Sequence, residues 1–134
     1  MKKLKAQNEP RIVVKTETKE DFFSRGRERA KALDAGKRVE IGRVISFENA
    51  EDLIKFITVA KVALLNAIRK KPASISTLAT KLHRSRASID KDVQLLESIG
   101  IVESEYVVNP GHGRYRIVRA VDDAPVKLQV ETII

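Results

Sequence analysis

Apolar residues recur every three or four positions through the middle of the chain, which is the spacing of amphipathic helices. We expect three such helices, over residues 59–70, 75–82 and 86–99. A capping hydroxyl precedes each of them, from Thr58, Ser74 and Ser85 in turn. The inward stripes are expected to be Val62, Leu64, Leu65 and Ile68, then Ile75, Leu78, Ala79 and Leu82, then Ile89, Val93, Leu96 and Ile99. The centre of the chain is therefore predicted to be helical, with one buried side per helix.

The second and third of these helices form the pattern of a helix-turn-helix across residues 72–102. A polar, basic turn at His83 and Arg84 joins them, and Gly100 ends the second one. A helix-turn-helix lays its second helix in the major groove of DNA. This segment therefore predicts sequence-specific DNA binding.

Alternating and β-branched runs predict strands on both sides of the helices. The expected strands cover residues 11–18, 39–47, 101–108, 114–121 and 125–134. The dense turn signal N-P-G-H-G at 109–113 joins the third and fourth of them into a hairpin. A hairpin directly after a recognition helix is the wing of a winged helix.

Two further helices are expected in the first half of the chain. One runs from Lys19 to Ala35, is capped by Thr18 and stops at Gly36; its apolar stripe is expected to consist of Phe22, Phe23, Ala30 and Leu33. The other is a short helix from Ala50 to Ile57, capped by Asn49, with Leu53, Ile54 and Ile57 apolar. A strand–helix–strand piece thus precedes the central helices.

These elements predict an α+β fold, a winged helix-turn-helix domain preceded by a strand–helix–strand N-terminal piece. We expect a flexible arm at 1–10, a dimerisation piece at 11–47, and a DNA-binding domain with a C-terminal strand at 48–134. A strand, a helix and a strand bury too little sheet to be stable alone. A homodimer, in which two such pieces meet across a two-fold axis, is therefore expected.

The composition of the chain limits the functions and partners that we expect. The 134 residues carry a formal net charge of +8, which points to a polyanionic partner. There is no cysteine and there are two histidines, neither with a triad partner by motif, so we expect no enzyme, no metal site and no cofactor. No apolar run approaches the roughly 20 residues of a membrane helix. A cytoplasmic, nucleoid-associated location is expected.

Several motifs resemble those of a known protein family. The chain carries S-F-E-N-A-E-D-L at 46–53, L-L-N-A-I at 64–68, P-A-S-I-S-T-L-A at 72–79, D-V-Q-L-L-E-S-I-G-I-V at 92–102 and A-L-D-A-G-K at 32–37. These runs resemble winged helix-turn-helix transcription regulators of the MarR-like group, closest to a family of small predicted prokaryotic regulators. The chain departs from that pattern at the start of the recognition helix, where Asp90 replaces a basic residue or histidine.

The resemblance implies a transcriptional regulator, in our interpretation a homodimeric repressor. Members often sit beside toxin-like genes, so the resemblance also implies an antitoxin role with a toxin as partner. A protein-interaction winged helix and an RNA-binding winged helix are the remaining alternatives. Binding to duplex DNA, with its dependence on salt, separates these hypotheses.

The expected contacts with double-stranded DNA lie on the recognition helix, on the turn before it, after the first helix and in the wing. They are Lys70, Lys71, Arg84, Ser85, Arg86, Ala87, Ser88, Lys91, His112, Arg114 and Arg116. Arg86 could pair with guanine, and Arg84 and Lys91 suit phosphates. Other roles are open: Ser85 is first of all a helix cap, and Arg86 could pair with Asp90 four residues later.

Overall fold

The computed structural model describes residues 9–37 and 42–134, and it falls into two units. Unit 1 is formed by the chain up to Phe56 together with Ala124–Ile134, and unit 2 by Ile57–Asp123. The expected arm at 1–10 and the start of the expected strand at 39–47 lie largely outside the described residues. Among the helices described, none combines the length and apolar character of a membrane span.

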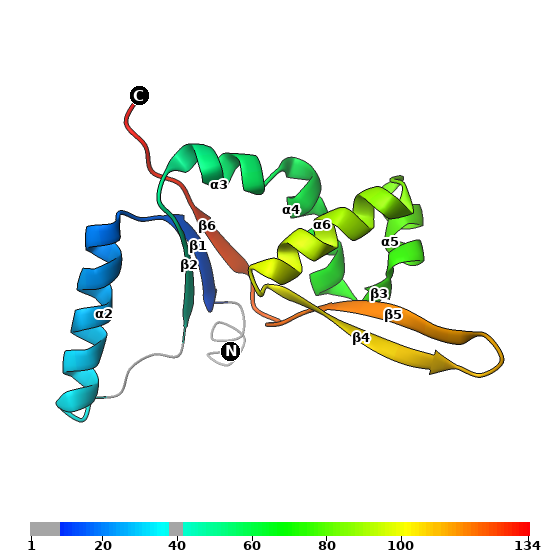
Figure 1. The fold of residues 1–134 in the computed structure, drawn as a ribbon, viewed down its shortest axis with the longest axis horizontal. Helices are drawn as coiled ribbons and strands as arrows, with labels where there is room; N and C mark the ends of the chain where they lie inside the picture. Colours follow the sequence, from blue (N-terminus) through cyan, green and yellow to red (C-terminus); the bar gives the residue numbers. More distant parts are fainter. Residues whose placement is uncertain (1–8, 38–41) are drawn as a thin grey trace. The chain divides into compact units, whose positions relative to one another are not determined.

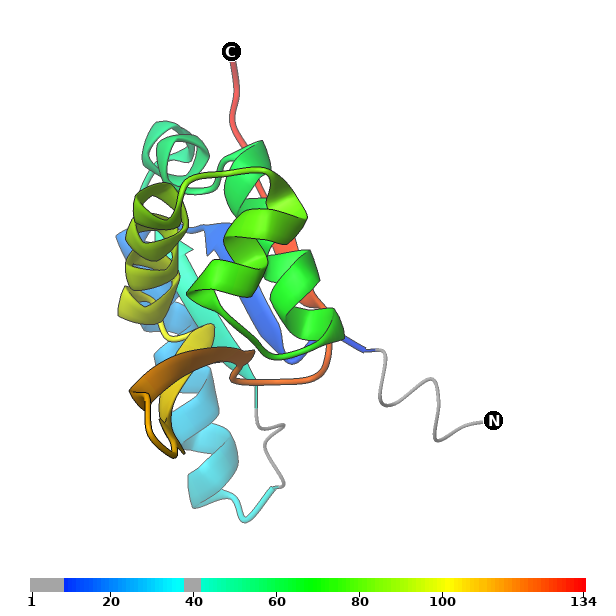
Figure 2. The ribbon, with the colours of Figure 1, turned by 90° about the vertical axis from the view of Figure 1, so that its right-hand side faces the viewer.

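Unit 2 is a winged helix-turn-helix, as expected (Figure 1). Its helices are α4 (Val59–Lys70), α5 (Ile75–Leu82) and α6 (Arg86–Ser98), and its strands are β3 (Ala73–Ser74), β4 (Val102–Asn109) and β5 (Gly113–Ala120). The antiparallel sheet has the order β3-β5-β4. Figure 2 shows the three helices packed together, and in Figure 1 the β4–β5 hairpin extends away from them as a wing.

The helix boundaries of unit 2 agree with the capping residues read from the sequence. The hydroxyls of Thr58, Ser74 and Ser85 each accept a hydrogen bond from the backbone N–H three residues later. The short turn between α5 and α6 contains His83 in the left-handed conformation, at φ 54°. Arg84 N donates to Ala79 O across the end of α5 at 3.0 Å, so one tight turn sets the direction of α6.

The core of unit 2 is built from the predicted stripes, with one error. Every helix contributes buried residues, which are Leu64, Ala67, Ile68, Leu78, Ala79, Ile89, Val93 and Leu96, and the sheet adds Val102 and Val118. Ile75, Leu82 and Ile99 are half-buried. The prediction for Val62 is wrong, because this side chain is 42% exposed while Ala67 occupies the inward position instead.

Unit 1 is a three-stranded sheet with two helices. Its elements are β1 (Ile12–Thr16), α2 (Lys19–Asp34), β2 (Arg43–Phe47), α3 (Ala50–Phe56) and β6 (Val126–Gln129). The strands run in the order β2-β1-β6, and both pairs are parallel. Ile12 and Val14 of the central strand are buried, and α3 contacts β1 and β2, with the rings of Phe47 and Phe56 5.5 Å apart.

The division into units differs from the expected boundary at residues 47 and 48. Helix α3 and the C-terminal strand β6 belong to unit 1, whereas both were expected in the DNA-binding domain. The physical reason is strand pairing: β6 bonds to β1 along Ile12–Lys15, and the backbone N–H of Glu131 donates to the hydroxyl of Thr16 at 3.0 Å. A periodic strand pattern gives no information about its pairing partner.

Helix α2 begins at the predicted Lys19 and ends at Asp34, one residue before the predicted end. The Thr18 hydroxyl caps it, and Gly36 follows it in the left-handed conformation at φ 73°. None of its residues is buried, and Phe23 and Leu33 are each 59% exposed. The predicted apolar stripe therefore lies at the surface of the single chain.

Helix α2 is held to the sheet of unit 1 by one carboxylate. Arg25 donates from Nε and Nη2 to Glu17 at 3.1 and 2.9 Å, and the hydroxyl of Ser46 donates to Glu17 at 2.6 Å. The hydrogen bonds from Arg25 lower the pKa of Glu17 from 4.5 to about 2, against the opposing effect of burial and with help from Ser46. The end of β1, strand β2 and helix α2 thus meet at one ion pair.

This ion pair predicts a specific loss of stability in acid. Because the pKa of Glu17 is depressed in the folded state, its stabilisation is complete above pH 4.5 and is lost as the pH falls towards 2. Glu17→Gln should lower the free energy of unfolding by about 2 kcal/mol at pH 7 and have little effect near pH 2. Urea unfolding followed by circular dichroism measures the free energy of unfolding at pH 7 and near pH 2. Glu20→Gln, an exposed change in the first turn of α2, is the control, and an equal loss for Glu17→Gln at both pH values would contradict the prediction.

Candidate nucleic-acid interface

Helix α6 presents one buried side and one exposed side. Ile89, Val93 and Leu96 are in the core, whereas Arg86, Ala87, Lys91 and Gln94 are exposed. The exposed positions return after four or five residues and then three, so they lie on one side of the helix. The N-terminal half of that side carries two cations, from Arg86 and Lys91.

The acidic residues of α6 are paired with arginines of unit 2. Asp90 accepts a hydrogen bond from Arg116 Nη1 at 2.6 Å and another from the Gln94 amide at 3.1 Å. Of the two roles left open for Arg86, pairing with Asp90 is not observed, because Arg116 on β5 binds that carboxylate. Asp92, which had no obvious partner in the sequence, accepts from Arg84 Nη2 at 2.6 Å.

Arg116 binds α6 to the wing. Besides Asp90, its guanidinium donates to Glu97 at 2.8 Å and to the hydroxyl of Ser104 on β4 at 2.8 Å. Ser104 in turn donates to Glu97. Burial alone lowers the pKa of Arg116, but the hydrogen bonds to Glu97 and Asp90 outweigh it and leave that pKa above its usual range. The recognition helix and the hairpin are therefore held in one fixed geometry.

Arg84 performs a similar task at the start of α6. Its Nη2 lies 2.6 Å from both the Ser88 hydroxyl and Asp92, and its side chain is only 21% exposed. Arg84 and Arg116 were both expected to contact DNA. Their guanidinium groups are engaged within unit 2 by three carboxylates of α6, from Asp90, Asp92 and Glu97.

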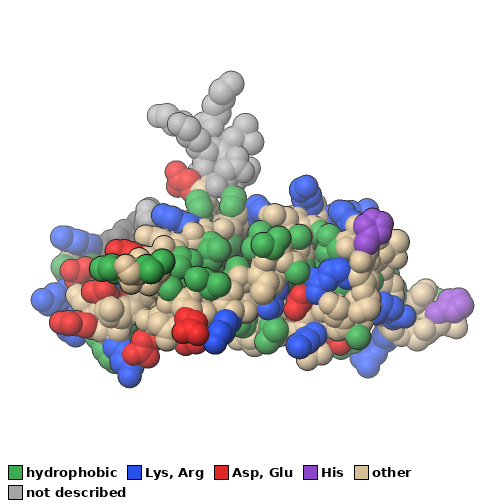
Figure 3. Space-filling model, turned by 90° about the horizontal axis from the view of Figure 1, so that it is seen from above, with side chains coloured by type: hydrophobic (Ala, Val, Ile, Leu, Met, Phe, Trp, Pro, Cys, Tyr) green, Lys and Arg blue, Asp and Glu red, His purple; other side chains and the backbone are tan. Residues whose placement is uncertain are grey.

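The remaining expected contacts are more accessible, with one exception. Lys70, Lys71, Ser85, Arg86, Ala87, Lys91, His112 and Arg114 are exposed, and Ser88 is half-buried by its bond to Arg84. Both histidines lie at the surface, where Figure 3 shows them in purple. On the wing, the Arg114 guanidinium lies 5.2 Å from the centre of the Tyr106 ring, which orients it without neutralising it.

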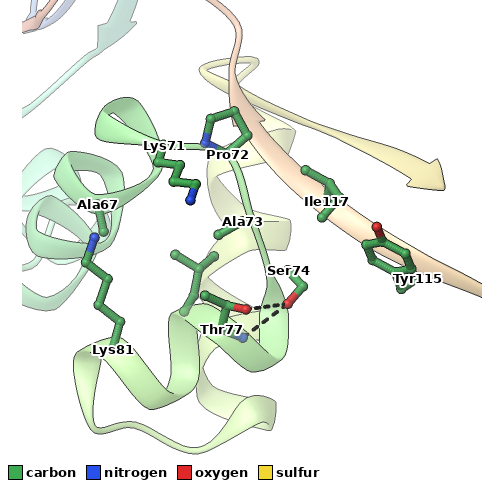
Figure 4. A pocket seen from close by; sticks show the side chains of 10 residues that line it. Ala67, Lys71, Pro72, Ala73, Ser74, Thr77, Lys81, Tyr115 and Ile117 are labelled. Carbon is green, nitrogen blue, oxygen red and sulfur yellow. Dashed lines mark hydrogen bonds between the residues drawn. The ribbon is translucent and has the colours of Figure 1, made fainter. Parts of the chain in front are cut away.

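A pocket beside the first turn of α5 gathers further cations (Figure 4). It encloses about 270 Å³ and is lined by Ala67, Lys71, Pro72, Ala73, Ser74, Thr77, Leu78, Lys81, Tyr115 and Ile117. Alanine, leucine and isoleucine side chains form its apolar part, and the Ser74–Thr77 hydrogen bonds close the helix cap at its edge. Lys71 precedes α5, Lys81 lies in its last turn, and Tyr115 lies on β5. Two ammonium groups and a phenol along one pocket suit an anion such as phosphate.

Sequence reasoning included Lys71 but did not select Lys81 or Tyr115 as contacts. Lys81 belongs to a basic run without acids between residues 61 and 84, which was the available signal. Tyr115 gave no signal, since only the pairing of β5 with β3 brings it to α5. Among the described residues, no group of three or more histidine, aspartate or glutamate side chains could hold a metal ion.

Removing the Arg116 guanidinium should weaken unit 2 well beyond a surface change. Arg116→Met leaves Asp90 and Glu97 unpaired, and we expect the free energy of unfolding to fall by about 2 kcal/mol. Arg114→Met, at an exposed position two residues earlier on the same strand, should change it by less than about 1 kcal/mol. Urea unfolding measures the loss in the free energy of unfolding for both variants. Equal losses would show that the network around Arg116 stabilises unit 2 no more than an exposed arginine does.

Comparisons with solved structures show the following similarities. A possible transcriptional regulator from Methanosarcina mazei Go1 has 18% identity and a TM-score of 0.47, covering 54% of this chain and 65% of that one. A mutant of ZitR from Lactococcus lactis in complex with DNA has 16% identity and a TM-score of 0.45, covering 75% and 64%. The homodimeric winged helix-turn-helix DNA-binding domain of Mb0332 from Mycobacterium bovis has 14% identity and a TM-score of 0.42, covering 57% and 74%.

The matched part therefore spans less than two thirds of the first two of these chains. No curated protein matches the sequence. A family model does: it is described as HVO_A0114 and matches residues 56–123, about half of the chain and the whole of unit 2. The chain belongs to the HVO_A0114 family.

Proposed function

We propose that the chain is a sequence-specific double-stranded DNA-binding transcriptional regulator. One observation carries the proposal: the exposed side of α6 bears Arg86 and Lys91, while Asp90 and Asp92 on the same helix are paired with arginines. An α6 with free carboxylates would repel phosphates. With both acids paired, this side of the helix is attractive to a polyanion.

Direct reading of bases is assigned to the first turns of α6. The guanidinium of Arg86 is exposed and forms no ion pair within the described residues, so it can make a bidentate contact with guanine. Ala87 beside it can touch a thymine methyl group, and Lys91 one turn later suits a phosphate. In this proposal Arg84, Ser88 and Arg116 position the helix, and Ser85 caps it.

Phosphate contacts are assigned to two places. Lys71 and Lys81, with the Tyr115 hydroxyl, can bind the DNA backbone at the pocket beside α5, and Lys70 adds a charge nearby in the sequence. On the wing, His112 and Arg114 are exposed and can reach flanking phosphates or the minor groove. These contacts fix the register of the protein on DNA and carry no base information.

Finer features of the proposal rest on sequence reasoning. We infer a homodimeric repressor without enzymatic activity, acting on a palindromic operator whose half-sites lie about one helical turn apart. Membership of the MarR-like group stays a prediction, and so does the alternative, an antitoxin or protein-interaction winged helix that neutralises a toxin. A regulator must prefer some duplex sequences over others, whereas the alternative functions without such a preference. A protein that binds no duplex selectively would therefore fit only the alternative.

The test is a selection of bound duplexes from fragmented genomic DNA, followed by fluorescence anisotropy over a range of salt. We expect one enriched sequence, and an affinity that falls steeply with salt because each phosphate contact contributes a slope of about −0.9. If the protein shows no preference among genomic duplexes at moderate salt, the proposed function is wrong.

Two variants should divide base reading from phosphate binding. Arg86→Ala should cost about 1–3 kcal/mol on the selected site and relax the preference at one base pair. Lys71→Ala should weaken all sequences alike and reduce the salt slope by about one. Lys127→Ala, an exposed lysine change on β6, is the control. Equal losses on all sequences for Arg86→Ala and Lys71→Ala would remove Arg86 as a base reader.

A further inference from the structure

Helix α2 turns its apolar side away from its own unit. Ser24, Arg25 and Ala32 are its half-buried residues, and Arg25 ties that side to Glu17. The large apolar residues lie elsewhere on the helix and are exposed, with Phe22 at 47%, Phe23 at 59% and Leu33 at 59%. An amphipathic helix normally buries its apolar side. Here the side facing the sheet is the polar one.

The exposed apolar residues form a continuous stripe. At about 100° per residue, Phe22, Gly26, Ala30 and Leu33 fall within about 80° of one another around the helix, and Phe23 extends the stripe on one edge. The half-buried side lies more than about 90° from the centre of this stripe. The rings of Phe22 and Phe23 pack edge to face with 5.5 Å between centres, which concentrates apolar surface near the start of α2.

We propose that this α2 stripe (Phe22, Phe23, Gly26, Ala30 and Leu33) pairs with the same stripe of a second copy, antiparallel, with the two helices crossing at Gly26. The proposal deepens the homodimer of the proposed function by naming its surface, and it stands on observations independent of DNA. The partner is thus a second copy of the chain, and the same apolar stripe forms both sides of the contact about a two-fold axis.

Shape supports this arrangement. Gly26 lies at the middle of α2, and a Cβ built there meets no atom within 4 Å, so the surface is open at this point. A small residue at a crossing point lets two helices approach closely. With the crossing at Gly26, Phe22 of one copy lies opposite Ala30 of the other, so that a large side chain meets a small one twice. A glycine in a helix is otherwise unfavourable, by about 1 kcal/mol relative to alanine.

Charge supports the same direction. The first turn of α2 is acidic, with Glu20 and Asp21, whereas Lys31 and Asp34 offset each other in its last turn. At about 100° per residue, Lys19 and Asp34 lie within about 80° of the centre of the stripe. In an antiparallel pair centred on Gly26, Lys19 of one copy therefore comes beside Asp34 of the other, twice by symmetry. A parallel pair would place the two acidic first turns side by side and align the helix dipoles. Antiparallel pairing is therefore favoured electrostatically.

The pairing should be of moderate strength. A helix of 16 residues is about 24 Å long, and one helix pair buries less than the roughly 800 Å² per partner of a standard interface. We expect a dimer that dissociates in the micromolar range. Light scattering of the full chain, without DNA, from about 1 to 200 micromolar should show the mass rising from one copy to two, and a monomer throughout would overturn the proposal.

Substitutions locate the interface. Phe23→Gln and Gly26→Leu should each raise the dissociation constant of the dimer at least tenfold. The first change removes apolar contact, and the second fills the space where the two helices cross. Phe23 is 59% exposed and a Cβ at Gly26 meets no atom within 4 Å, so circular dichroism should show an unchanged fold for both variants. Ile54→Gln on α3, with the same 59% exposure as Phe23, is the matched control. A dimer lost in the control and kept in the α2 variants would place the interface elsewhere.

Cross-linking tests the geometry directly, because the sequence contains no cysteine. Under mild oxidation Gly26→Cys should form a disulfide between copies, since the two positions face each other across the axis. Glu28→Cys, which lies on the opposite side of the helix, should not. Equal cross-linking of the two variants, or none in Gly26→Cys at dimer concentrations, would overturn the crossing at Gly26. Failure here leaves the DNA measurements on Arg86 and Lys71 unaffected, so the two proposals fail separately.

Discussion

One guanidinium, that of Arg116, connects the wing of unit 2 to helix α6. Arg116 lies on β5 and bonds to Asp90 and Glu97 on α6 and to Ser104 on β4, so one side chain connects the recognition helix with both strands of the wing. Ion pairs at an exposed surface contribute little, but a partly buried guanidinium with three partners is constrained in position and in charge. The orientation of the wing relative to α6 follows from this contact together with the buried residues Ile89, Val93 and Val118.

The same network resolves an apparent conflict in the charge of the recognition helix. Two aspartates on a helix proposed to enter a DNA groove would oppose binding. Arg84 and Arg116 pair with them, and the cations that stay exposed on this side are Arg86 and Lys91. Intramolecular pairing thus separates the basic residues of unit 2 into those that position the helix and those that are available to phosphates and bases. Formal net charge alone makes no such distinction.

In unit 1, helix α2 packs on the sheet through its polar side and leaves its apolar stripe exposed. Its sheet is held by parallel pairing of β1 with β2 and β6, and a buried carboxylate, Glu17, binds α2 through Arg25. This contact involves the polar side of the helix, so the apolar stripe is directed away from the sheet. A helix attached by its polar side buries little apolar area within its own unit. Its exposed apolar side is then a surface suited to association with another chain. The two units therefore use arginine–carboxylate contacts with different consequences.

The sequence by itself determined every helix of the described chain and its cap, because capping and amphipathic periodicity are local properties that neighbouring residues decide. It also determined the helix-turn-helix and the wing, but not which basic residues stay exposed, because Arg84 and Arg116 are ion-paired within unit 2. Only the tertiary structure decided which strands pair, and so assigned β6 and α3 to unit 1, because pairing joins residues such as Ile12 and Val126 that are distant in sequence. It likewise decided that Asp90 bonds to Arg116 rather than to Arg86, and that the stripe of Phe22 and Leu33 is exposed. Periodicity shows that a helix has an apolar side, and only packing decides what that side faces.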